Sequence, residues 1–207
     1  MTPRRWIVFG GSFDPPHRAH LQLPRRAAEA LGAERVLYVP ARLNPLKQKR
    51  PPASPEHRLA MLRLVLSDMP DTEIRTLELE REGPSYMAET LRRLAAEASN
   101  AAPPARLVLL VGSDTALGFP RWRAPEEVAV HADVAVMLRP PHDESSFLEA
   151  YRRSWRTADR PMSISPRWVL DLGADAASST AARSDAADDG VPPPVRAYIE
   201  KHALYRS

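Results

Sequence analysis

The sequence predicts an α/β fold in which a doubly wound, mainly parallel sheet carries helices on both faces. Short apolar or β-branched runs alternate along the chain with helical patterns of about 10 to 15 residues, which is the arrangement of repeated βαβ units. Turn-forming residues follow the first and the fourth of these runs, where ligands bind in such sheets. A chain of 207 residues can form one domain, so we expect a single domain over residues 1–207.

Each predicted element follows from its local pattern. The runs that predict strands are, in order, Trp6–Phe9, Arg35–Val39, Glu73–Leu79, Leu107–Val111, Val134–Leu138 and Trp168–Leu172. The helical patterns between and after them cover Ala19–Leu31, Pro55–Leu66, Tyr86–Ala98, Pro125–His131, Glu144–Trp155 and Val195–His202. The second helix has a clear start, because Ser54 can cap it and Pro55 suits the first helical position.

Composition narrows the class of protein. The chain has no cysteine, which removes thiol catalysis, thiolate zinc sites and disulfides. Its longest apolar run, Leu107–Val111, is too short to span a bilayer, so we expect a cytoplasmic protein without membrane attachment. The net charge is only +3 and the arginines are scattered along the chain, which disfavours a nucleic-acid-binding face.

The turn after the first predicted strand indicates an anion site. It reads "GGSFDPPHRAH" from Gly10 to His20, which matches neither the G-x-G-x-x-G pattern of dinucleotide sites nor the phosphate loop of NTPases. Its glycines let backbone N–H groups approach an anion at the start of a helix, where the dipole is positive. His17 and His20 are spaced i and i+3, so both rings can face that anion. We disfavour metal ligation, since the other histidines form no matching motif.

Five segments in order along the chain resemble a known family. "GGSFDPPHRAH" resembles the signature of the nucleotidyltransferase superfamily that transfers adenylyl or cytidylyl groups. "PSYMAETL" (Pro84–Leu91), "LLVGSDTALGFPRW" (Leu109–Trp122), "SSTAAR" (Ser178–Arg183) and "VPPPVRAYIEKHALY" (Val191–Tyr205) resemble successive blocks of bacterial nicotinate-nucleotide adenylyltransferases. This resemblance implies a Rossmann-like nucleotidyltransferase topology, with the S-x-T-x-x-R motif and the final helix in the part from about residue 174 to 207.

The resemblance also implies a reaction and a set of residues. ATP and nicotinate mononucleotide would be the substrates, Mg²⁺ would arrive with ATP, and no metal would be held by the protein alone. The implied catalytic residues are His17, His20 and Arg183. The implied ATP and phosphate contacts are Gly10, Gly11, Ser12, Phe13, Lys47, Ser178 and Thr180, and the implied nicotinate mononucleotide contacts are Tyr86, Met87, Thr90, Gly112, Asp114 and Trp122.

Some of these roles have structural alternatives. Trp122 could stack on the pyridine ring or be an ordinary core residue, and Asp114 could hold a ribose hydroxyl or cap the helix after "VGSD". The chain departs from the family pattern in three places. Ala19 stands for a glycine, where its methyl group would crowd the nucleotide, and Leu46 stands for a histidine. In "ASSTAAR" (Ala177–Arg183), alanines stand at the apolar positions of the late motif. The sequence does not predict an oligomeric state.

Two other functions remain possible at this stage. One is a different adenylyl or cytidylyl transferase of the superfamily, with nicotinamide mononucleotide or pantetheine phosphate as acceptor. The other is a noncatalytic nucleotide-binding or RNA-binding relative with a degraded site. The presence of His17, His20, Thr180 and Arg183 argues against the second.

Overall fold

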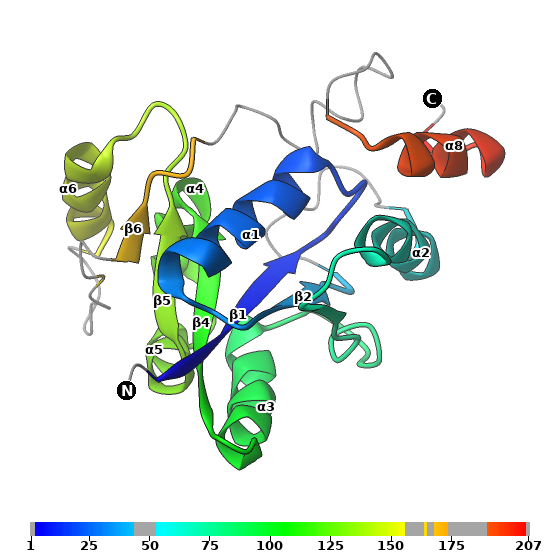
Figure 1. Cartoon of the computed structure of the whole chain (residues 1–207). Helices are drawn as coiled ribbons and strands as arrows, with labels where there is room; N and C mark the ends of the chain where they lie inside the picture. The colour runs from blue at the N-terminus through cyan, green and yellow to red at the C-terminus, as the bar shows by residue number, and fades with distance from the viewer. Residues whose placement is uncertain (1–2, 44–52, 156–163, 165–167, 174–189, 206–207) are drawn as a thin grey trace. The chain divides into compact units, whose positions relative to one another are not determined.

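The computed structural model describes residues 3–43, 53–155, 164, 168–173 and 190–205 (Figure 1). Six strands form one sheet in the order β3-β2-β1-β4-β5-β6. Their bounds are β1 (Arg4–Gly11), β2 (Arg35–Pro40), β3 (Thr72–Ile74), β4 (Ala105–Gly112), β5 (Asp133–Met137) and β6 (Val169–Leu170). The β1–β4, β4–β5 and β5–β6 pairs are parallel, which confirms the predicted α/β fold with its mainly parallel sheet.

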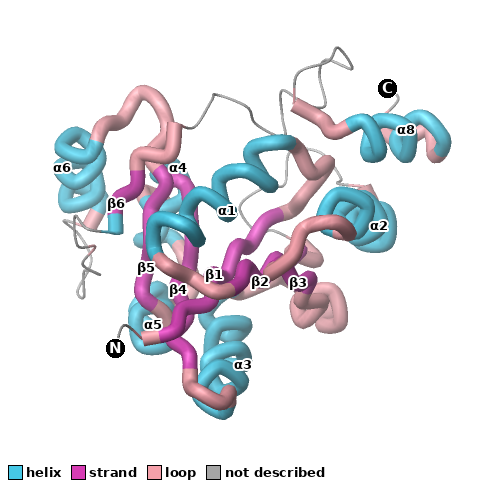
Figure 2. Tube along the Cα trace, in the orientation of Figure 1, coloured by secondary structure: helices cyan, strands magenta, loops and turns pink. Residues whose placement is uncertain are grey.

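Helices follow the strands in the described part of the chain, as Figure 2 shows. They are α1 (Arg18–Leu31), α2 (Pro55–Leu66), α3 (Met87–Asn100), α4 (Ser113–Ala116), the 3₁₀ helix η1 (Phe119–Arg121), α5 (Pro125–His131), α6 (Glu144–Ser154) and α8 (Pro193–Lys201). The predicted start of α2 is confirmed, because the Ser54 hydroxyl accepts a hydrogen bond from the backbone N–H of His57. Among the described residues, no helix combines the length and the apolar character that crossing a membrane requires.

The third strand is shorter than the sequence predicts. The prediction ran from Glu73 to Leu79, whereas β3 ends at Ile74. Beyond it the chain forms a turn in which the backbone N–H groups of Leu79 and Glu80 both donate to the carbonyl of Thr76. A residue bonded within such a turn cannot pair with a neighbouring strand, so the second half of the predicted run does not form a strand.

The last strand and the segment after β4 also differ from the prediction. The last strand was predicted to be Trp168–Leu172 but contains only Val169 and Leu170. The helix expected after "VGSD" is present as the short α4, whereas η1 was not predicted, because an element of about one turn leaves no periodic pattern in a sequence.

The chain divides into two compact units, each built from separate segments. The first unit contains Met1–Phe9, Leu23–Val36 and Tyr86–Ala176, and the second contains Gly10–Gln22, Leu37–Ser85 and Ala177–Ser207. The assignment of the whole chain to a single domain stays a prediction.

Fully buried strand residues form the core of the first unit. Ile7 of β1, Val108 and Leu110 of β4, and Ala135 and Val136 of β5 each expose 1% or less of their surface. Consecutive buried residues are expected where a parallel sheet is covered on both faces, because both sides of each strand then point into apolar surroundings. The core therefore explains why these runs are apolar without alternation.

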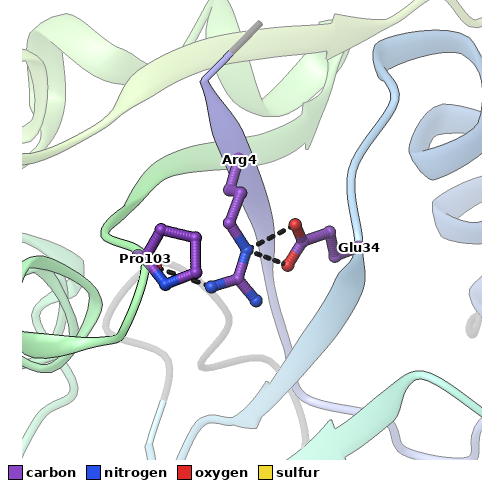
Figure 3. Close-up of polar contacts among 3 residues, drawn as sticks. All are labelled: Arg4, Glu34 and Pro103. Carbon is purple, nitrogen blue, oxygen red and sulfur yellow. Dashed lines mark hydrogen bonds and ion pairs between the residues drawn. The ribbon is translucent and has the colours of Figure 1, made fainter. Parts of the chain in front are cut away.

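Arg4 ties the beginning of β1 to its neighbours in the first unit (Figure 3). Its Nε lies 2.5 and 2.6 Å from the two carboxylate oxygens of Glu34, and its Nη1 donates to the carbonyl of Pro103 at 2.6 Å. The hydrogen bond from Arg4 lowers the pKa of the Glu34 carboxyl group. Because the pair is solvent-exposed, we expect it to fix the register of these segments more than it stabilises the fold.

Packing of α8 against α2 defines the second unit's apolar core (Figure 1). Met61 of α2 and Val195 of α8 are fully buried, and Val191 joins them from the segment before α8. Tyr198 and Tyr205 pack on the edge of this cluster. The segment with α8 therefore belongs to the same unit as the turn after β1 at residues 10–13, which we name the glycine turn.

Candidate active site

The glycine turn at the end of β1 is held in a strained and compact form. Phe13 has a φ of +48°, in the left-handed region that residues with a side chain rarely adopt, and its ring is only 1% exposed. A Cβ atom added to Gly11 would lie 3.1 Å from Cζ of that ring, so the aromatic ring occupies the space that a side chain at position 11 would need. Gly11 therefore permits the close approach of backbone and ring in this turn.

His17 and His20 are brought together, as their spacing predicts. Their rings stack with centroids 3.7 Å apart, and the backbone N–H of His17 donates to Nδ1 of His20 at 3.2 Å. Since Nδ1 of His20 accepts this bond, the proton of the neutral imidazole belongs on Nε2. The ring of Phe13 meets His20 edge-on at 5.1 Å between centroids, which limits its rotation.

Backbone contacts fix the start of α1, which contains His20 and directly follows His17. The hydroxyl of Tyr38 donates to the carbonyl of His20 at 3.0 Å, and burial raises the pKa of that hydroxyl, so it stays a donor. The N–H of Arg18 donates to the carbonyl of Gly190 at 2.7 Å. His17 is 2% exposed beneath this C-terminal segment, since a Cβ on Gly190 would lie 3.9 Å from Cβ of His17.

Sequence reasoning missed three residues that contact this turn. Arg58 of α2 is 1% exposed and donates to four backbone carbonyls, among them that of Ser12. Asp14 accepts hydrogen bonds from the N–H of Ala53 and from the hydroxyl of Tyr205. Arg58 stands in the apolar stretch "RLAMLRLVL", and a charged residue at a buried position of a helix is the signal that could have revealed it.

The predicted nicotinate contacts lie in the first unit, and Tyr86 marks the beginning of α3. Tyr86 is its N-cap residue, and its side chain makes no capping hydrogen bond among the described residues. The N-terminus of α3 thus presents the backbone N–H groups of its first turn, beginning with Met87, while Thr90 is buried one turn later. The guanidinium of Arg123 lies 4.8 Å from the centroid of the Tyr86 ring, an arrangement that holds the ring and adds a positive charge.

Gly112 and Asp114 lie together at the end of β4. A Cβ on Gly112 would be 2.6 Å from Oδ1 of Asp114 and 3.1 Å from Nε of Arg139, so a side chain there would displace these two side chains. Asp114 does not cap α4, because the N-cap residue is Gly112; the capping alternative from the sequence is therefore wrong. Its carboxylate is 66% exposed and lies 3.8 Å from Nη1 of Arg139, which leaves it accessible to a ligand hydroxyl.

Trp122 follows η1 and packs by one edge against the core. Its ring meets that of Phe119 at 66° with centroids 4.5 Å apart, and Phe119 is fully buried whereas Trp122 is half-buried. Such a contact fixes the plane of the indole while part of it stays exposed. Both sequence-based interpretations of Trp122, anchor in the core and stacking surface, are compatible with this position.

Four predicted site residues lie outside the described residues: Lys47, Ser178, Thr180 and Arg183. Among the residues that the structure does describe, no group of three or more histidine, aspartate or glutamate side chains is placed to hold a metal ion.

Comparison with known proteins places these features in a family context. A family model described as cytidylyltransferase-like matches residues 8–184. A protein of Symbiobacterium thermophilum is 38% identical over 97% of this chain and 95% of its own length, and one of Bordetella petrii is 37% identical over 98% of this chain and 100% of its own. Both are named as probable nicotinate-nucleotide adenylyltransferases.

Solved structures agree on the fold. Nicotinic acid mononucleotide adenylyltransferase from Plasmodium falciparum, complexed with APC, superimposes with a TM-score of 0.73 at 16% identity and covers 98% of this chain and 97% of the other. The same enzyme complexed with NaAD gives a TM-score of 0.72 at 17% identity. At this level of identity the similarity supports the fold alone.

Proposed function

Because the chain belongs to the cytidylyltransferase-like family, and within it to the nicotinate-nucleotide adenylyltransferases, we propose that it transfers the adenylyl group of ATP to nicotinate mononucleotide. The products are nicotinate adenine dinucleotide and pyrophosphate. The observation that carries this proposal is the stacked pair of His17 and His20 after the glycine turn, where imidazole and backbone donors would face the phosphates of ATP together.

The reaction needs no nucleophile from the protein. An oxygen of the mononucleotide's 5′-phosphate attacks the α-phosphorus of ATP, and the bond from that phosphorus to the oxygen bridging to the β-phosphate breaks, so that pyrophosphate leaves with the electron pair. The chain's task is positioning and charge stabilisation, and orientation alone can supply roughly 7–11 kcal/mol of barrier reduction.

Residues of the glycine turn would hold the reacting phosphates. Gly10, Gly11, Ser12 and Phe13 form the turn over which they lie. His20 donates from Nε2 to the α-phosphoryl oxygens, because its Nδ1 is already engaged by the N–H of His17. A donor fixed in advance at developing negative charge stabilises the transition state more than the ground state.

The late motif would bind the leaving group. Ser178, Thr180 and Arg183 are assigned to the β- and γ-phosphates, with Lys47 as a further cation, on the strength of the family resemblance. An arginine binds two phosphate oxygens at once through its planar guanidinium, which suits a leaving pyrophosphate.

Residues at the start of α3 and after β4 would recognise the acceptor. Tyr86 and Met87, with Thr90 behind them, present the N-terminus of α3 to the nicotinate carboxylate, and Arg123 adds a positive charge close to Tyr86. Gly112 leaves room at the end of β4, and the exposed carboxylate of Asp114 accepts a hydrogen bond from a ribose hydroxyl. Trp122 stacks on the pyridine ring.

Mg²⁺ would arrive with ATP. The groups described around the glycine turn are imidazoles, backbone N–H groups, the guanidinium of Arg58 and the carboxylate of Asp14, which accepts hydrogen bonds. This set of donors suits phosphate oxygens rather than Mg²⁺, which prefers oxygen ligands in octahedral geometry. The ion would neutralise phosphate charge when bound, while the residues of the chain orient the nucleotides.

Pyrophosphate release tests the proposal directly. The purified chain is incubated with ATP and Mg²⁺, alone and with nicotinate mononucleotide, nicotinamide mononucleotide or pantetheine phosphate. We expect rapid release only with nicotinate mononucleotide and formation of one dinucleotide per pyrophosphate. Release that is fastest with another acceptor would assign the chain to a different transferase, and no release with any acceptor would favour a noncatalytic relative.

A further inference from the structure

We propose that Arg58, Asp14 and Tyr205 form a positioning network that holds the glycine turn in the conformation that binds the triphosphate. This inference rests on the proposed function, since the turn is the part of the chain assigned to ATP. None of the three residues needs to touch a substrate. Their effect comes from the backbone that they hold.

Arg58 connects three segments of the second unit. Its Nη1 donates to the carbonyls of Ser12 and Ala41, both at 2.7 Å, its Nη2 to that of Arg42 at 3.0 Å, and its Nε to that of Ala53 at 3.0 Å. These acceptors belong to the glycine turn, to the chain after β2 and to the entry into α2. One buried guanidinium therefore fixes the turn to two neighbouring segments.

Because the peptide bond is planar, a hydrogen bond to a carbonyl also fixes the direction of the N–H group that follows it. In a trans peptide the carbonyl and the following N–H point in opposite directions. With the Ser12 carbonyl bonded to Arg58, the N–H of Phe13 points away from the guanidinium. The same geometry is visible one segment away, where the Ala41 carbonyl bonds Arg58 and the N–H of Arg42 donates to Oγ of Ser85 at 3.0 Å.

The positive charge of Arg58 also favours anion binding at the glycine turn. All its acceptors among the described residues are neutral carbonyls, and burial lowers the pKa of the guanidinium while the charge of Asp14 opposes that shift. An arginine stays protonated even so. A buried positive charge behind the turn favours anions on the other side, because low-dielectric surroundings screen it weakly.

Asp14 and Tyr205 complete the network from the other end of the chain. Oδ1 of Asp14 accepts from the N–H of Ala53 at 3.1 Å and from the hydroxyl of Tyr205 at 2.5 Å. Ala53 is thus bonded through both its N–H and its carbonyl, to Asp14 and to Arg58. Loss of the Tyr205 hydroxyl removes a bond to Asp14 and loosens the turn without opening a cavity.

The first experiment compares two tyrosine hydroxyls. Tyr205→Phe removes the bond to Asp14, whereas the matched control Tyr198→Phe removes a hydroxyl that lies 3.0 Å from Nδ1 of His57, on the same C-terminal segment. We expect Tyr205→Phe to raise the Kd for Mg-ATP, measured by calorimetry without acceptor, by about threefold to tenfold. The KM for nicotinate mononucleotide should change less than about twofold, and Tyr198→Phe should bind ATP as the wild type does.

The second experiment separates charge from geometry at Arg58. Arg58→Lys keeps the charge but loses the planar fork that reaches four carbonyls, so we expect at least about a tenfold rise in the same Kd. Arg63→Lys is the control, because Arg63 is exposed on the same helix. The melting temperature of every variant is measured. A raised Kd in Arg58→Lys beside a wild-type Kd in Arg63→Lys would support the planar fork rather than the charge alone.

Two results would overturn the network. The first is ATP binding at wild-type strength in both Tyr205→Phe and Arg58→Lys. The second is an equal loss in Tyr198→Phe, which would assign the effect to general docking of the C-terminal segment. A wild type that binds ATP but does not convert nicotinate mononucleotide would contradict the proposed acceptor instead, and the binding comparison would still decide the network.

Discussion

The backbone N–H of His17 donates a hydrogen bond to Nδ1 of His20 across 3.2 Å, and the two imidazole rings stack with centroids 3.7 Å apart. This bond makes Nε2 the protonated nitrogen of His20 when the ring is neutral. A histidine that is a donor over the physiological pH range does not have to be charged to stabilise a phosphoryl oxygen. The pair is therefore organised before ATP arrives.

Replacement of His20 by alanine should lower kcat by about 10²–10³, the effect of losing one preorganised donor at the reacting phosphate. Binding of nicotinate mononucleotide should stay nearly unchanged, because the donor acts on the other substrate. Steady-state rates of pyrophosphate release give both quantities. His20→Gln, whose amide N–H lies near the position of Nε2–H, should recover part of the loss.

His131→Ala is the matched control, since His131 ends α5 in the other compact unit. We expect it to keep wild-type rates. If His20→Ala turned over like the wild type, His20 would have no role in stabilising the transferring group.

Replacement of Arg183 by alanine should raise the KM for ATP and lower kcat, with little change in the KM for nicotinate mononucleotide. The reason is that the bidentate contact proposed for Arg183, to the leaving pyrophosphate, would form only on the triphosphate side. Arg92→Ala, an exposed position on α3, serves as the control. A defect confined to the mononucleotide would instead assign Arg183 to the acceptor.

Much of the fold could be predicted because the core strands are continuous apolar runs. Runs such as Leu107–Val111 are buried on both sides, and the serine before Pro55 caps its helix as expected. The prediction made the third strand too long, because the sequence does not show that Thr76 closes a turn with Leu79 and Glu80. Local hydrogen bonds decided that boundary.

The site was predictable only where its residues are close in sequence. The i, i+3 spacing placed His17 and His20 together, because both lie at one helix start. Asp14 and Tyr205 meet although they are 191 positions apart, and no local pattern encodes that contact. Arg58 looked like one more arginine in an arginine-rich chain, and its position in the apolar stretch "RLAMLRLVL" was a signal that only its burial made clear.

The N-cap of α6 should make stability depend on acid pH. Hydrogen bonds from the backbone and side chain of Ser146 and from the hydroxyl of Ser145 lower the pKa of Asp143 from its ordinary value of 3.8 to about 2. A lowered pKa in the folded state means that the contribution is complete above the ordinary value and is lost as the pH falls through about 4 to about 2. Asp143→Ala should therefore lower the melting temperature by roughly 2–4 °C near neutral pH.

The difference between the melting temperatures of the wild type and Asp143→Ala should shrink as the pH approaches about 2, where both lack a charged cap. Glu149→Ala is the control on the same helix, because Glu149 is 72% exposed and pairs only with Arg153 among the described residues. A difference that stayed constant down to pH 2 would mean that the carboxylate charge does not contribute.

The chain should prefer the acid over the amide form of the mononucleotide by at least about tenfold in kcat/KM. Met87 cannot donate a hydrogen bond from its side chain, so recognition must come from the backbone N–H groups at the start of α3, aided by the positive end of its dipole. These donors satisfy a carboxylate, whereas the NH₂ of an amide would face other N–H groups at a cost of roughly 1–3 kcal/mol.

The structure adds one element to this argument, the guanidinium of Arg123 at 4.8 Å from the Tyr86 ring. Its charge also favours the acid, so Arg123→Gln should lower the acid-to-amide ratio of kcat/KM by about twofold to fivefold. The effect is modest because the side chain is exposed. Arg121→Gln, two positions earlier and also exposed, is the control and should leave the ratio unchanged. Rates with both mononucleotides at matched ATP measure the ratio. Equal rates for acid and amide in the wild type would mean that the chain recognises the ring by stacking on Trp122 alone. Recognition of the carboxylate by charge would then be contradicted.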